Sequence, residues 1–221
     1  MLTLLHMPLC PFSRLARLAL AEKGFAFDLV RIHPWEDEDF PRLNPAGTVP
    51  VLVVDERHVV PDSLVIAEFA EENAPEPTLL PGGPLARAEA RRLAHWLAGG
   101  LWPEVVEPLL FEKVMRREKH MGGPDMTRIR EARARRPAHL DVLEGLADRR
   151  HFLAGERLSL ADLAAAAQIS TLDFLDDVPW EDHPRLKEWY ARVKSRPSFR
   201  PLLADQTAGI EPPAHYADLD F

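Results

Sequence analysis

The chain has 221 residues, of which 46% are hydrophobic, and this is enough to bury a sizeable core in one or two domains. The formal net charge of −8 argues against a nucleic-acid partner, and no apolar run reaches the roughly 18 residues that span a bilayer. A single cysteine, Cys10, excludes an internal disulfide, which fits a cytoplasmic protein. The N-terminal sequence does not have the pattern of a signal peptide, and we expect no metal site.

The first 75 residues combine strand patterns with two helix patterns. Ser13 is the expected start of the first helix and Gly24 its stop. Asp62 or Ser63 is expected to begin the second helix, which runs to residue 73. Strands are expected at residues 2–6, 25–32, 49–54 and 58–60, with an irregular segment at 34–44. This order predicts an α/β domain of the thioredoxin-like type over residues 1–75.

The rest of the sequence has only helix and loop patterns. Residues 76–84 are rich in proline and glycine and are the expected linker. Pro103 and Pro108 are expected to kink one helical stretch, and Pro137 to interrupt another. Helices are expected at residues 85–101, 127–149, 159–175 and 184–195. We therefore expect an all-α C-terminal domain at residues 85–205, followed by a tail at 206–221.

Four short motifs follow one another along the chain. They are Pro-Leu-Cys-Pro-Phe-Ser-Arg at residues 8–14, Asn-Pro-Ala-Gly-Thr-Val-Pro-Val-Leu at 44–52, Asp-Ser-Leu-Val-Ile at 62–66 and Leu-Ser-Leu-Ala-Asp-Leu at 158–163. In the last motif, Ser159 and Asp162 have the spacing of a helix capping box. Together the motifs resemble the cytosolic glutathione S-transferase superfamily across nearly the whole chain. The resemblance implies its two-domain fold.

In that superfamily a side chain at the start of the first helix meets the thiol of glutathione. The resemblance therefore places Cys10 or Ser13 at the glutathione sulfur, because a helix N-terminus stabilises a thiolate. Cys10 would form a mixed disulfide with glutathione, whereas Ser13 would donate a hydrogen bond to its thiolate. Purely structural roles are the alternative: Ser13 caps the helix, and Cys10 fills space in the core.

The second and third motifs imply the rest of a glutathione site. A cis bond before Pro50 would let the backbone of Val49 pair with the cysteinyl backbone of glutathione. Ser63 would hold the γ-glutamyl carboxylate and Asp62 the ammonium group. Each motif also has a structural explanation, since thioredoxin-like domains share the cis-proline and Asp62 can act as a plain N-cap.

Two regions depart from ordinary transferases: the loop Pro34-Trp35-Glu36 and the closing residues 210–221. With residues 107–113 and 195–201 they resemble one branch of the superfamily, transferase-like bacterial division proteins that bind FtsZ filaments. That resemblance implies a homodimer that favours curved filaments at the division site, regulates constriction and lacks evident transferase activity. The residues expected to contact the partner are Trp35, Tyr216, Asp218, Leu219, Asp220 and Phe221.

Three alternatives remain open from the sequence. The tail either contacts a partner or packs on its own helical domain. The basic stretch at residues 113–136 is either a solvated helix surface or a face for an acidic partner. The chain is either a non-enzymatic filament-binding protein or a glutathione-dependent transferase or thiol-disulfide reductase.

Overall fold

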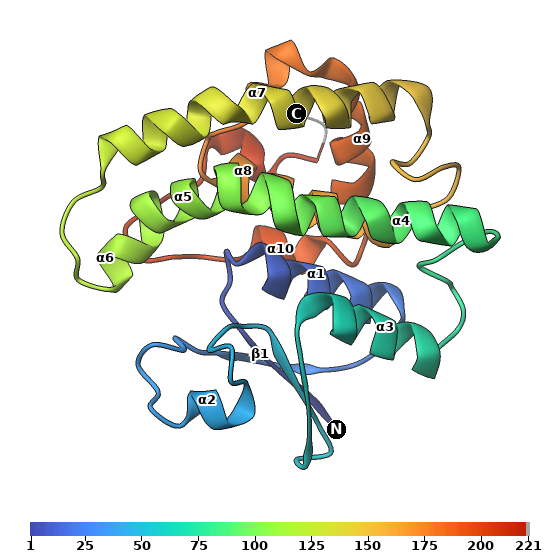
Figure 1. Ribbon diagram of the computed structural model, residues 1–221, viewed down its shortest axis with the longest axis horizontal. Coiled ribbons are helices and arrows are strands. Elements are labelled where there is room, and N and C mark those ends of the chain that lie inside the picture. The colour runs from blue at the N-terminus through green and yellow to red at the C-terminus, as the bar shows by residue number, and fades with distance from the viewer. Residues whose placement is uncertain (220–221) are drawn as a thin grey trace. The chain divides into compact units, whose positions relative to one another are not determined.

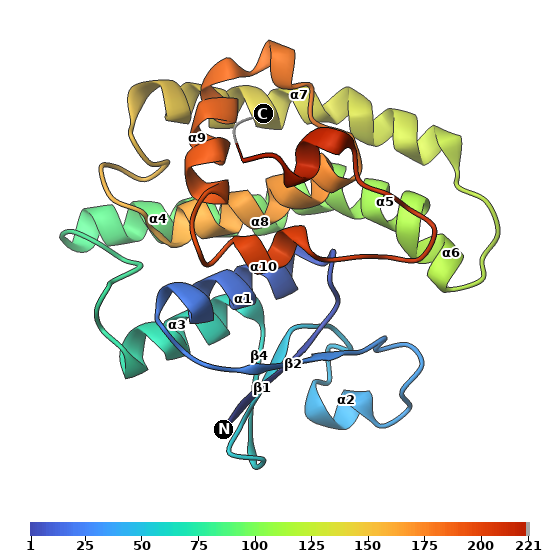
Figure 2. The ribbon, with the colours of Figure 1, turned by 180° about the vertical axis from the view of Figure 1, so that it is seen from behind.

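The computed structural model describes residues 1–219, which form two units divided between Leu79 and Leu80. The N-terminal unit is built on a four-stranded sheet in the order β2-β1-β3-β4 (Figures 1 and 2). Strand β2 runs parallel to β1, and β3 is antiparallel to both of its neighbours. The strands are β1 (Leu2–His6), β2 (Asp28–Arg31), β3 (Val51–Val54) and β4 (His58–Pro61). This order confirms the thioredoxin-like α/β fold.

Helices α1 (Pro11–Glu22) and α3 (Ser63–Asn73) pack on one face of this sheet, where Leu4 and Leu52 meet the apolar sides of both helices. Alternation along a strand turns the neighbouring Val51 to the other face. There it contacts Phe40, the first residue of the short helix α2 (Phe40–Leu43). The sequence predicts an irregular segment at residues 34–44, but part of it is a helical turn, which Phe40 anchors.

Helix α1 begins two residues earlier than the sequence predicted. Cys10 is the N-cap residue, and Pro11 occupies the first helical position, where its missing N–H costs nothing. The helix ends as expected next to Gly24, which adopts a φ of 74° that suits glycine. Strand β2 is shorter than predicted, since Phe25 and Phe27 pack against the core from the loop before it.

The C-terminal unit is all helical, as predicted, and opens with a continuous helical run. The run contains α4 (Pro84–Trp96), the π-helical segment η1 (Leu97–Val106), α5 (Glu107–Leu110), the π-helical segment η2 (Phe111–Met115) and α6 (Arg116–Glu118). Pro103 lies inside η1, whose wide turns suit a residue without an amide proton. Pro108 falls in the first turn of α5, where proline is tolerated.

Helix α7 (Met126–Arg149) runs alongside this first helical run, as Figures 1 and 2 both show. Pro137 lies within α7, so the expected interruption is wrong. Proline removes one backbone hydrogen bond, but Ala132 and Leu140 on either side are buried and hold both halves in place.

Helix α8 (Leu160–Phe174) is the centre of this unit, and all of its residues are buried. Its N-terminus carries the predicted capping box of Ser159 and Asp162. The remaining elements surround it and are η3 (Trp180–Asp182), α9 (Pro184–Lys194), α10 (Arg200–Leu203) and η4 (Ala214–Ala217). Figure 2 shows the terminal segment running past α5 and α6 and returning over α8 toward α9.

Candidate thiol site and partner-binding surface

The start of α1 places Cys10 against the backbone of Val49. The Cys10 thiol is buried and points at the Val49 carbonyl oxygen, with an S···O distance of 3.9 Å. Burial raises the pKa of the Cys10 thiol, although hydrogen bonds from Ser13 and from the Phe12 amide act in the opposite direction. The resting group is therefore a neutral thiol rather than the thiolate that nucleophilic chemistry requires.

Ser13 lies next to this thiol, but it is not the helix cap that the sequence allowed. It occupies the third position of α1 and is fully buried. Its hydroxyl oxygen accepts a hydrogen bond from the Met7 amide at 3.3 Å. Ser13 thus ties the end of β1 to the first turn of α1 and helps to position Cys10.

The Val49-Pro50 peptide bond is cis, as the resemblance implied. The Pro50 carbonyl oxygen accepts a hydrogen bond from the Asp62 amide at 3.3 Å, which brings the start of α3 beside it. The structure therefore gathers Cys10, Val49 and Asp62 into one region of the N-terminal unit. Pairs far apart in sequence meet there because β3 lies next to β1 and β4 leads back into α3.

Asp62 is the N-cap of α3, which the sequence predicted as one of two choices. Its carboxylate accepts from the amides of Leu64 and Val65 at 2.8 and 3.3 Å. These bonds satisfy helix N–H groups that an anionic ligand would otherwise use. Ser63 is the first helical residue and is buried. The geometry of this motif is accounted for by capping alone.

Trp35 is half-buried in the loop after β2. Its ring meets that of His33 edge to face at 5.0 Å. A hydrogen bond from the Glu36 amide to the His33 carbonyl closes a turn around it. The turn therefore places the Trp35 ring against His33 and leaves part of its surface accessible.

The terminal segment, residues 206–219, packs on the helical unit. This agrees with the second of the two alternatives that the sequence left open for the tail. Tyr216 is fully buried, its ring lies 5.2 Å from that of Phe174, and its hydroxyl donates to the Leu202 carbonyl at 3.3 Å. Tyr216 is therefore an internal anchor, and the expectation that it faces a partner is wrong. Asp218 is exposed and Leu219 half-buried, while Asp220 and Phe221 lie outside the described residues.

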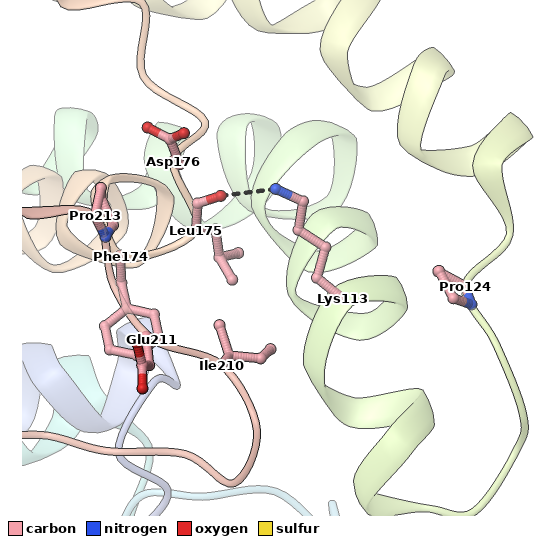
Figure 3. Close-up of a pocket in the computed structure, with 8 residues that line it drawn as sticks. All are labelled: Lys113, Pro124, Phe174, Leu175, Asp176, Ile210, Glu211 and Pro213. Atoms are coloured by element: carbon pink, nitrogen blue, oxygen red, sulfur yellow. Dashed lines mark hydrogen bonds between the residues drawn. The ribbon is translucent and has the colours of Figure 1, made fainter.

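A cavity of about 400 Å³ opens beside the terminal segment, and no motif in the sequence predicts it. Figure 3 shows Lys113 reaching from η2 to donate a hydrogen bond to the Leu175 carbonyl, at 2.7 Å. Residues of the terminal segment form another wall. The lining residues are Lys113, Pro124, Phe174, Leu175, Asp176, Ile210, Glu211 and Pro213. Folding places these segments together because the chain returns past α6 after α10.

Part of the basic stretch converges on one buried carboxylate, that of Asp177. Lys113 makes a short ion pair with it, and Arg133 and Arg136 approach it at 2.7 and 3.3 Å. Asp177 is only 1% exposed, so its charge is well shielded from water. Because three cations of the basic stretch converge on this one carboxylate, that part of the stretch is not a simple solvated helix surface.

Residues 1–219 contain no group of three or more histidine, cysteine, aspartate or glutamate side chains arranged to hold a metal ion. Over the same residues, no helix has the length and apolar character that crossing a membrane requires.

Comparison with known proteins gives matches over both units. The family model described as glutathione S-transferase, N-terminal domain, matches residues 9–73, and the one described as glutathione S-transferase, C-terminal domain, matches residues 106–197. FtsZ-localized protein A from Caulobacter vibrioides is 46% identical over 99% of this chain and 98% of its own length.

Two solved structures resemble this one closely over essentially their full length. A glutathione S-transferase from Rhodospirillum rubrum is 48% identical, with a TM-score of 0.96 and complete coverage of both chains. FzlA from C. crescentus is 46% identical, with a TM-score of 0.94 and coverage of 100% of this chain and 99% of the other.

Proposed function

The chain belongs to the glutathione S-transferase superfamily, and from that membership we propose that it is a non-enzymatic, FtsZ-binding protein of bacterial cell division. The observation that carries the proposal is its 46% identity to FtsZ-localized protein A over nearly the whole of both chains. The protein acts as a cytoplasmic homodimer at the division site. It binds FtsZ filaments, favours their curved form and so regulates constriction.

The partner contacts that we propose are Trp35, Asp218 and Leu219, together with Asp220 and Phe221 beyond the described residues. Trp35 and Leu219 are partly accessible to solvent, and Asp218 is exposed. Tryptophan is among the residue types in which energetically important interface positions are enriched, and the apolar Leu219 directly follows the charged Asp218 in the chain. A homodimer presents each contact twice, so weak contacts along a filament gain from effective concentration.

The state of Cys10 supports a role without catalysis. Glutathione-dependent redox chemistry at this position needs an accessible thiolate. In this chain burial raises the pKa of the Cys10 thiol, and the sulfur hydrogen-bonds to the Val49 carbonyl, a group that glutathione would have to use. A buried neutral thiol with an internal partner fits a structural role.

Co-sedimentation with GTP-polymerised FtsZ tests the proposal. Truncation after residue 206 would remove the buried Tyr216, so point variants at accessible positions are the sharper probes. We expect the intact protein to pellet with the polymer, and Trp35→Ala and Asp218→Ala each to weaken binding about tenfold, the size of one good interface contact. Glu156→Ala is the matched control, an exposed carboxylate on a loop of the helical unit. Equal pelleting of all four proteins would reject the proposed contacts, and pelleting of none would reject the function.

A glutathione-dependent enzyme is the second candidate, and it is favoured by a specific arrangement. The cis Val49-Pro50 bond lies beside the start of α3, where Asp62 and Ser63 would hold the γ-glutamyl end of glutathione. Titration calorimetry with millimolar glutathione separates the candidates. Heat of binding, together with an activity that Cys10→Ser abolishes, would establish the enzyme. The absence of heat and of any melting shift would leave the site as an inherited structural element.

A further inference from the structure

A buried carboxylate near the C-terminal end of α8 holds several partners from different parts of the helical unit. Asp173 is fully buried, and its Oδ1 accepts a hydrogen bond from the Trp180 indole at 3.0 Å. The same oxygen lies 3.0 Å from Nε2 of His215 in the terminal segment. Since a carboxylate oxygen only accepts, Nε2 of His215 carries the proton. Asp173 therefore joins α8 to η3 and to the terminal segment.

Lys194 at the end of α9 completes the group. It is fully buried, and its ammonium lies 3.7 Å from Oδ2 of Asp173. The rings of Tyr190 and Tyr216 lie within cation–π range, at 5.5 and 5.7 Å. The same ammonium donates a hydrogen bond to the His215 carbonyl at 3.2 Å.

The charges of this group are costly to bury. Burial raises the pKa of Asp173, opposed mainly by Lys194, and burial lowers the pKa of Lys194, opposed mainly by Asp173 and then by Asp218. A well-packed apolar pair would usually be at least as stable as such an ion pair. The charged groups instead add geometric specificity, because charged hydrogen bonds fix the relative positions of their partners more tightly than apolar contacts do.

The part of the chain whose position these bonds fix is the terminal segment. His215 is held at two points, by its ring on Asp173 and by its carbonyl on Lys194. Asp218 follows three residues later, and its charge acts on Lys194. The amides of Tyr216 and Asp218 close short turns onto Pro213 and His215, at 2.9 and 3.1 Å. A segment fixed in this way presents Asp218 in one defined position.

We propose that Asp173, Lys194 and His215 form a tail clasp that positions the terminal segment for partner binding. The clasp also holds one wall of the cavity, because Ile210, Glu211 and Pro213 belong to the same segment. These are positioning residues, which act through Asp218 and Leu219 rather than by touching the partner. The partner part of this inference rests on the proposed FtsZ function, whereas the clasp itself does not.

The test compares His215→Ala with His215→Gln in the full-length protein. His215 is 31% exposed, and without it Asp173 keeps Trp180 and Lys194, so the fold survives the change. The glutamine amide offers a donor in place of the histidine Nε2–H and should restore the clasp. His95→Ala on the exposed face of α4 is the matched control.

Amide hydrogen exchange of residues 207–219 measures directly how firmly the clasp holds the terminal segment. We expect exchange about tenfold faster in His215→Ala, the loss of one hydrogen bond to a charged group, and near wild-type exchange in His215→Gln and His95→Ala. Unchanged exchange in His215→Ala would overturn the clasp and leave Tyr216 as the anchor.

Co-sedimentation of the same variants with FtsZ polymer measures whether the clasp affects partner binding. Weaker binding of His215→Ala by about tenfold, with rescue by glutamine, supports positioning. Faster exchange with undiminished binding would overturn the positioning role. If the wild type itself fails to pellet, the proposed function and the partner part of the inference fall, and exchange alone decides the clasp.

Discussion

Asp162 gives the sharpest prediction about stability, because one buried carboxylate satisfies four donors. Its Oδ1 accepts from the Leu153 amide at 2.8 Å and from the Trp189 indole at 2.9 Å. Its Oδ2 accepts from the Ser159 amide at 2.9 Å and from the Ser159 hydroxyl at 2.8 Å. These bonds join the start of α8 to α9 and to the loop that follows α7.

Asp162→Ala strands three N–H donors in the core, and each stranded donor costs about 1–3 kcal/mol. Burial raises the pKa of Asp162, so removing its charge returns part of that loss. We expect a net decrease of about 3 kcal/mol in the free energy of unfolding, more than the roughly 1 kcal/mol of an ordinary helix cap. Asp162→Asn keeps an acceptor for Leu153 and Trp189 and should cost about 1.5 kcal/mol.

Urea unfolding at pH 7, followed by tryptophan fluorescence, measures this loss, because four of the five tryptophans lie in the helical unit. Asp148→Ala is the control, since its pair with Arg185 is exposed and is worth less than about 1 kcal/mol. A loss below about 1 kcal/mol for Asp162→Ala, or an equal loss for asparagine and alanine, would refute the reasoning.

Three further predictions concern other charged or reactive groups. Arg92, with help from Arg150, lowers the pKa of Glu89 to about 2, so its stabilisation is present above the unfolded pKa and disappears as the pH falls from about 5 to 2. Glu89→Gln should therefore cost about 1 kcal/mol in urea unfolding at pH 7 and less than about half of that at pH 3, and a pH-independent difference would contradict this. The buried Cys10 thiol, whose pKa burial raises, should react with a thiol reagent far more slowly at pH 8 in the folded than in the urea-unfolded protein; equal rates would show the sulfur to be accessible. Asp177→Asn leaves three cations without their carboxylate and should lower stability by about 2 kcal/mol, which an unchanged melting temperature would disprove.

Features fixed by neighbours in sequence were predictable. The capping box of Ser159 and Asp162 depends on a spacing of three residues, and the N-cap role of Asp62 on its place before an apolar run. The sequence places the start of α1 at Ser13 because serine is a favourable N-cap residue, whereas the helix begins at Pro11. Pro11, however, is better suited to a first helical position than to the residue before a helix.

Features that depend on distant contacts were not predictable from the sequence. Tyr216 looked like an exposed anchor, because nothing near it in the chain could bury it, yet its ring meets Phe174. Asp173 and His215 lie 42 residues apart, so their hydrogen bond gives no local signal. The same holds for Pro137, whose effect on α7 is outweighed by packing against other helices.

We propose that this transferase fold binds FtsZ filaments without needing glutathione. The most direct measurement is a titration of GTP-polymerised FtsZ with the intact protein, followed by pelleting, with and without millimolar glutathione. We expect saturable binding with the same affinity in both conditions. Failure to pellet, or binding that appears only when glutathione is present, would contradict the account.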